Sequence, residues 1–362
     1  MSVPQVEHGI PLATLTTFRL GGPAERLVTA VTEQQVVETV TSADAEGRPL
    51  LVVGGGSNLI VSDEGFPGTV LRIATEDLQV RADADAVRVE AAAGVVWDDL
   101  VQHAIGLGVA GVECMSGIPG SVGATPIQNV GAYGQEVAET IESVRVYDRH
   151  QRELVDLPAA ECGFRYRHSR FKDAPDRYVV LSVRFAFAPP APGRPAAALV
   201  RYAELARALG VQPGDQVEPA VAREAVLRLR AGKGMVLDPA DHDSWSAGSF
   251  FTNPILTVAE FEVFERRAAE RLGPDAAPPR YPAGESMVKT SAAWLIERAG
   301  FPKGYGAGRP VTISTKHTLA LTNRGSARTE DLLTLAREVR DGVRAAFGVE
   351  LVNEPVLVGV KL

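Results

Sequence analysis

The chain has 362 residues. At roughly 100 to 200 residues per domain, this length predicts two or three domains. Hydrophobic residues make up 45% and charged residues 23%, which excludes a disordered or fibrous chain. The formal net charge of −8 argues against binding to nucleic acid or to an acidic membrane surface, so an anionic ligand would need local cations.

The cysteines and histidines also exclude several classes of protein. Cys114 and Cys162 are too few for a disulfide framework and form no C-x-x-C pair, so a reducing cytoplasm is expected. The six histidines have no metal-ligand spacing, and we predict no metal. Neither an export signal nor a membrane-spanning segment is indicated.

Helix and strand signals alternate in the first half. Thr32 and Gln35 resemble a capping box that opens a helix over 33–45, which Gly47 ends. Residues 50–53 read as a buried strand that enters a glycine loop. Further strands are expected at 70–73, 87–91, 141–147 and 178–187, and in the last of these Leu181, Val183, Phe185 and Phe187 alternate as in a half-buried strand.

The second half begins after a change in composition. Residues 188–199 are rich in Pro and Ala, which predicts a connection or a domain boundary. A helix should run from Pro219 to near Gly232, and another over 292–299. The strongest helix signal starts with Thr329 as cap and ends at Gly348. The expected apolar faces are Val221, Ala225 and Leu229 in the first helix, and Leu332, Ala336, Val339, Val343 and Phe347 in the last.

Two glycine-rich segments are candidate ligand loops. In the segment 52–63, glycines after a buried strand leave backbone N–H groups open to a phosphate, although a tight turn explains them equally well. The spacing lacks the third glycine of a dinucleotide fingerprint and the lysine of a P-loop. The segment 116–134 is mostly small and apolar, so it either wraps a large polar ligand such as a dinucleotide or bonds internally.

Three further segments carry reactive side chains. Residues 162–172 interleave four Arg and one Lys with aromatic residues, which indicates a carboxylate or phosphate site, or else a solvated basic face. If this segment alternates, only some of the Arg point inward. Ser249 lies beside two Phe and is a positioned proton donor or a turn cap. Glu354 precedes a Pro between apolar strands and is either exposed at a strand end or held at a site.

Taken in order, these segments resemble the UDP-N-acetylenolpyruvoylglucosamine reductase family. The resemblance runs from Thr17-Phe18-Arg19-Leu20-Gly21-Gly22 through GGGSN, IPGSVGATPIQNVGAYG, YRHSRFK and GSFFTNP to Asn353-Glu354-Pro355, nearly the whole chain. The stretch 196–231, with Tyr202, is similar to the substrate-covering segment of the longer form of these enzymes. Thr16 stands where the family usually has Asn, at a position that we expect to be remote from the chemistry.

The resemblance implies an α+β fold: a two-subdomain FAD-binding region of the vanillyl-alcohol-oxidase type, followed by a C-terminal α+β substrate-binding domain. The implied boundaries are 1–68 for the first FAD subdomain, completed by 336–362; 69–230 for the second, with the substrate-covering segment 196–231; and 231–335 for the substrate domain. It also implies a cytoplasmic monomer that binds neither nucleic acid nor membrane.

The resemblance further implies noncovalent FAD, NADPH as hydride donor, and UDP-N-acetylglucosamine enolpyruvate as substrate. The implied catalytic residues are Arg167, which stabilises an enolate, Glu354, which orients groups around it, and Ser249, which donates a proton. Residues implied in substrate binding are Tyr202, Arg230, Lys233, Asn253 and His317. Residues implied in FAD binding are Val53, Gly54, Gly55, Gly56, Ser57, Asn58, Leu59, Ser116, Ile118, Pro119, Gly120, Gly123, Ala124, Gln128, Gly131, Ala132 and Gly134.

Two rival functions follow from the same residues. One is another FAD-dependent oxidase of this fold, often with flavin bound covalently to His or Cys; the absence of His from both glycine loops argues against it. The other is a nucleotide-binding protein without catalysis, which the presence of Arg167, Ser249 and Glu354 disfavours.

Overall fold

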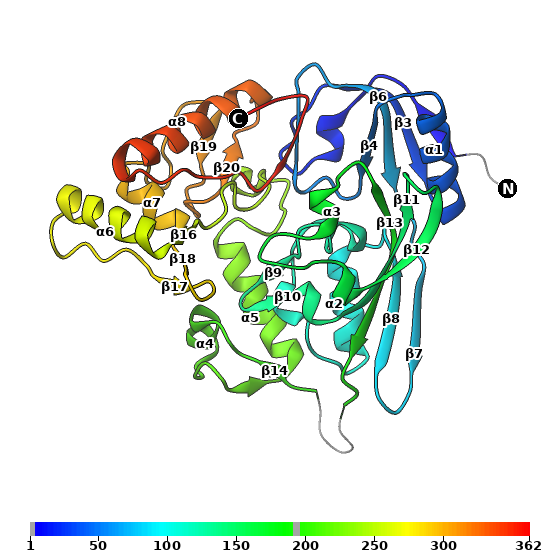
Figure 1. Cartoon of the computed structure of the whole chain (residues 1–362), viewed down its shortest axis with the longest axis horizontal. Coiled ribbons are helices and arrows are strands. Elements are labelled where there is room, and N and C mark those ends of the chain that lie inside the picture. The colour runs from blue at the N-terminus through cyan, green and yellow to red at the C-terminus, as the bar shows by residue number, and fades with distance from the viewer. Residues whose placement is uncertain (1–3, 191–195) are drawn as a thin grey trace. The chain divides into compact units, whose positions relative to one another are not determined.

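The computed structural model describes residues 4–190 and 196–362 (Figure 1). Residues 191–195 of the predicted connection 188–199 lie outside these ranges. The chain divides into two compact units, whereas the three-part division expected from the resemblance stays a prediction. Over the described residues, unit 1 comprises the chain up to Ile10, Ala24–Gly56 and Phe66–Val236, and unit 2 comprises Pro11–Pro23, Ser57–Gly65 and Leu237–Leu362.

The first sheet of unit 1 carries the predicted glycine loop at the end of one strand. Its order is β1-β3-β6-β4, with β3 and β4 parallel to β6. The Thr32 side chain accepts a hydrogen bond from the Gln35 N–H, and Gly47 follows the helix, as predicted. The elements are β1 (Gln5–Glu7), β2 (Ile10–Pro11), β3 (Pro23–Ala30), α1 (Glu33–Ala45), β4 (Leu50–Val53) and β6 (Phe66–Ile73).

The second sheet of unit 1 is antiparallel, in the order β12-β11-β13-β8-β7. Its strands are β7 (Leu78–Ala82), β8 (Val87–Ala92), β11 (Ile141–Asp148), β12 (Glu153–Pro158) and β13 (Tyr178–Phe187). The long strand β13 runs between β11 and β8 (Figure 1). The prediction that β13 is half-buried is wrong for its first part, because every residue from Val179 to Val183 is buried. Alternation appears only from Arg184 onward.

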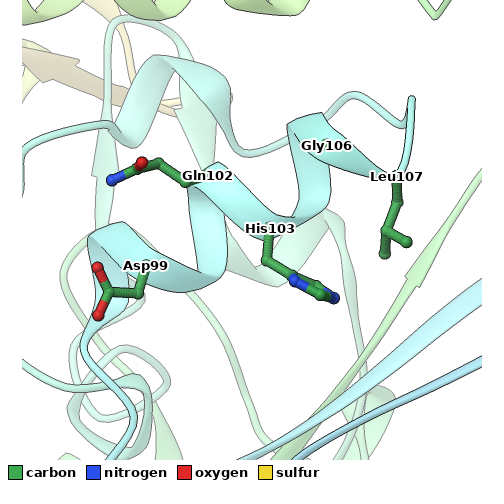
Figure 2. A pocket seen from close by; sticks show the side chains of 5 residues that line it. All are labelled: Asp99, Gln102, His103, Gly106 and Leu107. Atoms are coloured by element: carbon green, nitrogen blue, oxygen red, sulfur yellow. The ribbon is translucent and has the colours of Figure 1, made fainter.

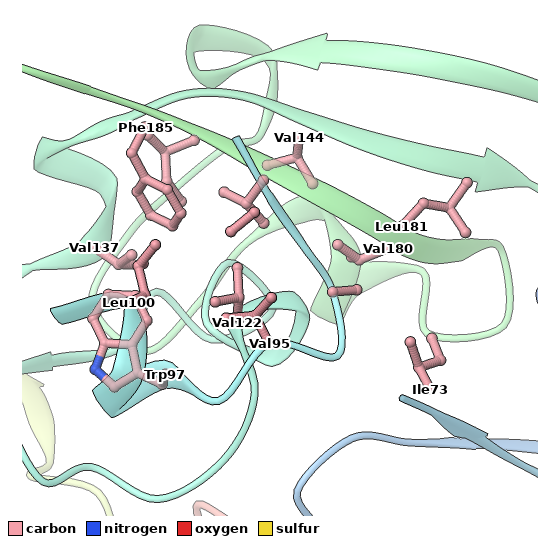
Figure 3. Packing of buried hydrophobic residues seen from close by; sticks show 14 of the residues in the cluster. Ile73, Val95, Trp97, Leu100, Val122, Val137, Val144, Val180, Leu181 and Phe185 are labelled. Carbon is pink, nitrogen blue, oxygen red and sulfur yellow. The ribbon is translucent and has the colours of Figure 1, made fainter. Parts of the chain in front are cut away.

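The main core of unit 1 joins this sheet to helix α2 (Trp97–Gly106). The rings of Trp97 and Phe185 lie 6.1 Å apart, and Leu100 and Val122 point into the same cluster (Figure 3). The indole Nε1–H of Trp97 donates to the Met115 carbonyl oxygen at 3.0 Å. Because Met115 immediately precedes the second glycine-rich segment, the core fixes where that segment begins.

The predicted substrate-covering segment forms a small cluster of its own within unit 1. It contains β14 (Ala198–Leu199), α4 (Ala203–Leu209), β15 (Gln216–Val217) and α5 (Pro219–Gly232). Buried Leu205 and Ala206 of α4 pack with Ala225 and Val226 of α5. The predicted apolar face of α5 is partly wrong, since Val221 is 44% exposed. Ala222 and Val226 are buried together with Ala225.

Unit 2 contains short sheets and three longer helices. Helix α8 buries all five predicted apolar positions and ends at Gly348, which has φ 72°. Thr329 is the first helical residue rather than the cap, because its hydroxyl donates to the Val61 carbonyl oxygen. The elements are β5 (Leu59–Val61), β16 (Ile255–Thr257), α6 (Val258–Leu272), β17 (Tyr281–Pro282), β18 (Met287–Lys289), α7 (Ala292–Arg298), β19 (Val311–Ile313), β20 (Leu321–Asn323), α8 (Thr329–Phe347) and β21 (Val356–Val358).

Within 4–190 and 196–362, no helix has both the length and the apolar character needed to cross a membrane.

Short elements complete the description. They are β9 (Gly131–Ala132), β10 (Gln135–Glu136) and α3 (Arg170–Asp173), with 3-10 turns at Leu12–Leu15, Glu113–Met115, Val122–Ala124, Val137–Glu139, Ala159–Glu161 and His242–Ser244.

Candidate active site

The two predicted glycine loops meet in unit 1 at a distance that only glycine allows. A Cβ atom built on Gly55 would lie 2.6 Å from the Cα of Gly120, and one on Gly54 would lie 2.1 Å from the Ser121 Oγ. Gly56 has φ 60°, a left-handed conformation that favours glycine. Backbone N–H groups without side chains around them suit a pyrophosphate, so these residues fit the dinucleotide FAD.

The second loop is partly bonded to itself and partly open. The N–H groups of Val122 and Gly123 donate to the carbonyl oxygens of Val95 and Ala93, and buried Ser116 donates to the Glu113 carbonyl oxygen. Within the loop, the Ala124 N–H donates to the Ser121 carbonyl oxygen and the Val130 N–H to the Thr125 carbonyl oxygen, each at 3.0 Å. Bonds inside the loop and bonds to its neighbours therefore both hold its shape. Its other predicted FAD contacts are exposed or half-buried: Ile118, Pro119, Gly120, Ala124, Gln128, Gly131, Ala132 and Gly134.

A buried carboxylate ties the two ends of this loop together. Glu113 is fully buried and accepts hydrogen bonds from the Gly111 N–H at 2.6 Å and from the Gln135 side chain at 2.6 Å. The side-chain amide oxygen of Gln135 in turn accepts from the Cys114 N–H at 2.8 Å. This pair is visible only in the structure, because nothing in a lone Glu and a lone Gln 22 positions apart marks them as partners in the sequence.

A second carboxylate joins the loop to α5. Asp98 accepts from the Gly117 N–H at 2.7 Å and from both Nη atoms of Arg223, each at 2.7 Å. Burial acts to raise the pKa of Asp98, but the hydrogen bonds from Arg223 and Gly117 lower it overall. A Cβ on Gly117 would lie 2.7 Å from the Leu227 side chain. The predicted FAD loop and the predicted substrate segment are thus held by one side chain.

We expect Asp98→Asn to lower the free energy of unfolding by about 1.5 to 3 kcal/mol, the range for hydrogen bonds to a charged group. The side-chain amide of Asn has only one acceptor oxygen, so it cannot accept hydrogen bonds from both Nη groups of Arg223 and from the Gly117 N–H. Urea unfolding followed by circular dichroism measures the change. Asp99→Asn is the matched control, because Asp99 lies in the same helical turn but is exposed. Equal losses in the two variants would assign the effect to the helix terminus instead.

Arg167 lies in a tight turn rather than in an alternating strand. Arg165 and His168 exchange backbone hydrogen bonds, and Arg167 has φ 52°. The Arg167 guanidinium donates to the carbonyl oxygens of Gly131 at 2.7 Å and Asn129 at 3.4 Å. The segment does not alternate here, because the turn at 165–168 reverses the chain. It brings one catalytic candidate onto the predicted FAD loop.

Three predicted substrate contacts lie together on the segment 196–236. Tyr202 is 49% exposed, and Lys233 directly follows α5. Arg230 is buried; its Nη2 donates to the Met235 carbonyl oxygen, while its Nε has no hydrogen-bond partner in the described chain. Burial lowers the pKa of Arg230 to about 10. A buried guanidinium with an unsatisfied N–H is suited to an anion.

Ser249 and Glu354 are brought together within unit 2. The Glu354 N–H donates to the Phe250 carbonyl oxygen at 2.8 Å, and Phe251 forms a β-bridge with Asn353. The Asn58 side chain lies 3.4 Å from the Glu354 carbonyl oxygen. The segments that carry Ser249, Glu354 and Asn58 are therefore joined by hydrogen bonds, although Asn58 and Glu354 are 296 residues apart in the sequence.

Thr17, the residue after the departure at Thr16, is linked to the segment that carries Ser249. Its hydroxyl donates to the Ser246 carbonyl oxygen at 2.6 Å, three residues before Ser249. The Arg19 guanidinium stacks on the neighbouring Trp245 ring at 3.8 Å. Thr16, the departure from the family pattern, bonds only locally in the hydrogen bonds observed, to the backbone of Leu20.

The remaining substrate candidates lie on turns of unit 2. The Asn253 side-chain oxygen accepts from the Ala292 N–H at 3.0 Å and thereby supports the start of α7. The His317 N–H donates to the Ser314 hydroxyl at 3.2 Å. Nearby, buried Asp243 accepts from the Thr315 N–H and from Arg324, which orders this turn.

Other features add no chemistry. An open depression lies along the outer side of α2, where Asp99, Gln102 and His103 project from one helix (Figure 2). Among the residues of the described ranges, no group of three or more His, Cys, Asp or Glu side chains is placed to hold a metal ion.

Comparison with known proteins agrees with this geometry. A family model described as "UDP-N-acetylenolpyruvoylglucosamine reductase, C-terminal domain" matches residues 238–358. A model described as "FAD binding domain" matches residues 24–156. These matches agree with the predicted FAD-binding region of the vanillyl-alcohol-oxidase type, followed by a C-terminal α+β part.

Relatives match over nearly the full length. The chain is 64% identical to UDP-N-acetylenolpyruvoylglucosamine reductase of Streptomyces avermitilis, covering 98% of this chain and 95% of the relative. It is 59% identical to the Thermobifida fusca reductase, covering 98% of each chain. The crystal structure of the Thermus caldophilus reductase superposes with a TM-score of 0.65 and 27% identity, covering 98% of this chain and 100% of that one. The chain belongs to the UDP-N-acetylenolpyruvoylglucosamine reductase family.

Proposed function

We propose that the chain reduces UDP-N-acetylglucosamine enolpyruvate to UDP-N-acetylmuramate, a step of peptidoglycan precursor synthesis, with NADPH as hydride donor and FAD as cofactor. The observation that carries this proposal is the match at 64% identity along 98% of the chain to a reductase of that name. The fit of the glycine loops to a dinucleotide supports it independently, because a Cβ on Gly55 would occupy the space of Gly120.

The FAD-binding residues would act through their backbone. A bound FAD would supply the redox chemistry, a hydride transfer from NADPH to the terminal CH₂ of the enolpyruvyl group. Gly54 to Gly56 and Gly120 would present N–H groups to the pyrophosphate. The carboxylates of Glu113 and Asp98 would keep the second loop in place, since Glu113 accepts from Gln135, just after the loop, and Asp98 accepts from Gly117, near its start.

The three catalytic candidates would act on the substrate. Hydride addition to the CH₂ leaves negative charge on the substrate carboxylate as an enolate. Arg167 would stabilise that charge, because its guanidinium is already oriented by the carbonyl oxygen of Gly131. Ser249 would donate its proton to the carbon that bears the ether oxygen. Glu354, whose backbone is bonded to Phe250, would orient groups around the reacting carbon.

Tyr202, Arg230, Lys233, Asn253 and His317 would bind the substrate. Arg230 and Lys233 would supply the positive charge that a diphosphate needs on a chain of net charge −8. We also propose that the protein is a cytoplasmic monomer. The free, buried thiols of Cys114 and Cys162 support a reducing compartment.

The visible spectrum tests the proposal. Purified protein should absorb near the flavin maximum, lose that absorbance when NADPH is added without oxygen, and regain it when the enolpyruvyl substrate follows. A protein that bleaches but is not reoxidised by this substrate is a different FAD-dependent oxidoreductase of the same fold. A colourless protein that binds the nucleotide would be the catalytically silent alternative.

A further inference from the structure

Lys233, a proposed ligand of the substrate diphosphate, already has an anionic partner. Its Nζ lies 2.6 Å from the Glu204 Oε2, and the side chains are 29% and 33% exposed. The same ammonium lies 5.6 Å from the centre of the Tyr133 ring, in the predicted FAD loop. At least one of the N–H donors of the Lys233 ammonium is therefore already bonded to a carboxylate.

The backbone that carries Glu204 is fixed on two sides. Residues 205 and 206 are buried against α5, the helix that Lys233 follows. On the other side, the Arg201 guanidinium donates to the Gly134 carbonyl oxygen at 3.1 Å and pairs with Glu139. The Glu204 carboxylate can therefore leave Lys233 by rotating its side chain, but α4 holds its backbone near the ammonium.

Tyr202 links this ion pair to the predicted covering segment. Tyr202 precedes Glu204 by two residues, and its ring meets that of Tyr133 edge to face, with centres 5.6 Å apart. The Tyr133 ring thus lies next to both Tyr202 and Lys233, and Lys233 is the partner of Glu204.

We infer that Glu204 sets the affinity for the substrate by competing with its diphosphate for Lys233. This inference rests on the proposed function. A diphosphate bound to Lys233 would have to share the ammonium with the Glu204 carboxylate, whose Oε2 already lies 2.6 Å from Nζ. Substrate binding must therefore break or weaken the Glu204–Lys233 pair, and that cost lowers affinity. Glu204 is an affinity-setting residue that makes no bond to the substrate itself.

The test is a double-mutant cycle on the FAD-loaded enzyme, with UDP-N-acetylglucosamine as the probe and calorimetry as the measurement. Glu204→Gln should tighten binding roughly two- to five-fold, which corresponds to the ordinary strength of a partly exposed ion pair. Lys233→Met should weaken binding about ten-fold. Adding Glu204→Gln to Lys233→Met should not change the affinity for the probe any further, because Glu204 then has no ammonium for which it could compete.

Glu224→Gln is the matched control. It removes the same charge from an exposed ion pair with Arg228 on α5 and should leave the dissociation constant unchanged. Weaker binding by Glu204→Gln would overturn the inference and make Glu204 a residue that positions Lys233. If Glu204→Gln tightens binding equally in the presence of Lys233 and in the Lys233→Met background, the inference is wrong too. It is also wrong if UDP-N-acetylglucosamine binds to none of these proteins. NADPH bleaching and reoxidation of the unaltered enzyme report separately on the proposed function.

Discussion

Ser249→Ala should bleach with NADPH at close to the normal rate, whereas reoxidation by the enolpyruvyl substrate should slow by about 10²-fold or more. Only the second half-reaction requires a proton on the substrate carbon, and the loss of a positioned acid typically costs this much. The backbone around Ser249 is held by hydrogen bonds from Phe250 to Leu319 and from Glu354 to Phe250, so the loop should keep its shape. Anaerobic stopped-flow absorbance separates the two rates.

Two further variants sharpen this experiment. Ser249→Cys keeps a transferable proton and should retain more activity than the alanine variant. Ser246→Ala removes a hydroxyl three residues away that accepts from the Gly248 N–H, so it tests loop shape without removing the proposed acid. If Ser249→Ala slows both half-reactions equally, Ser249 is a structural residue and the proton-donor role is wrong.

Gly55→Val should yield protein that purifies without yellow colour. A side chain at this position would begin 2.6 Å from the Cα of Gly120, so the two loops must separate and their N–H groups lose their arrangement. Flavin released into the supernatant by acid precipitation measures the loss, and its release from the unaltered protein also tests noncovalent binding. Gly106→Val is the control, because nothing lies within 4 Å of a Cβ there. If Gly55→Val retains a full complement of FAD, this loop is not part of the FAD site.

Local signals in the sequence were sufficient for the regular elements. Thr32 and Gly47 bracket α1, and apolar spacing from Leu332 to Phe347 gives the buried face of α8. Both signals act within a few residues of one another. The face of α5 was misjudged because alanine packs in a core as readily as valine does, and pattern alone did not favour Ala222 over Val221.

The residue types and motifs of the candidate site could be predicted from the sequence, but the long-range hydrogen bonds that hold its loops in place could not. Thr17 contacts Ser246 across 229 positions, and Asp98 contacts Arg223 across 125. Neither pair has a spacing that a single sequence could reveal. Arg167 was named from its motif, whereas its left-handed turn and its bonds to the glycine-rich loop depend on the packed structure.

The interleaving of the two units constrains how the protein is made. The chain passes from one unit to the other five times, at positions 10, 23, 56, 65 and 236. β5 finds its parallel partner β21 only after Val356–Val358 have left the ribosome. At about 5 to 20 residues per second, Ile60, fully buried in the finished fold, waits roughly 15 to 60 seconds for that partner. The β5–β21 pair of unit 2 therefore cannot form until Val356–Val358 have been synthesised, and until then Ile60 lacks the strand partner that it has in the finished fold.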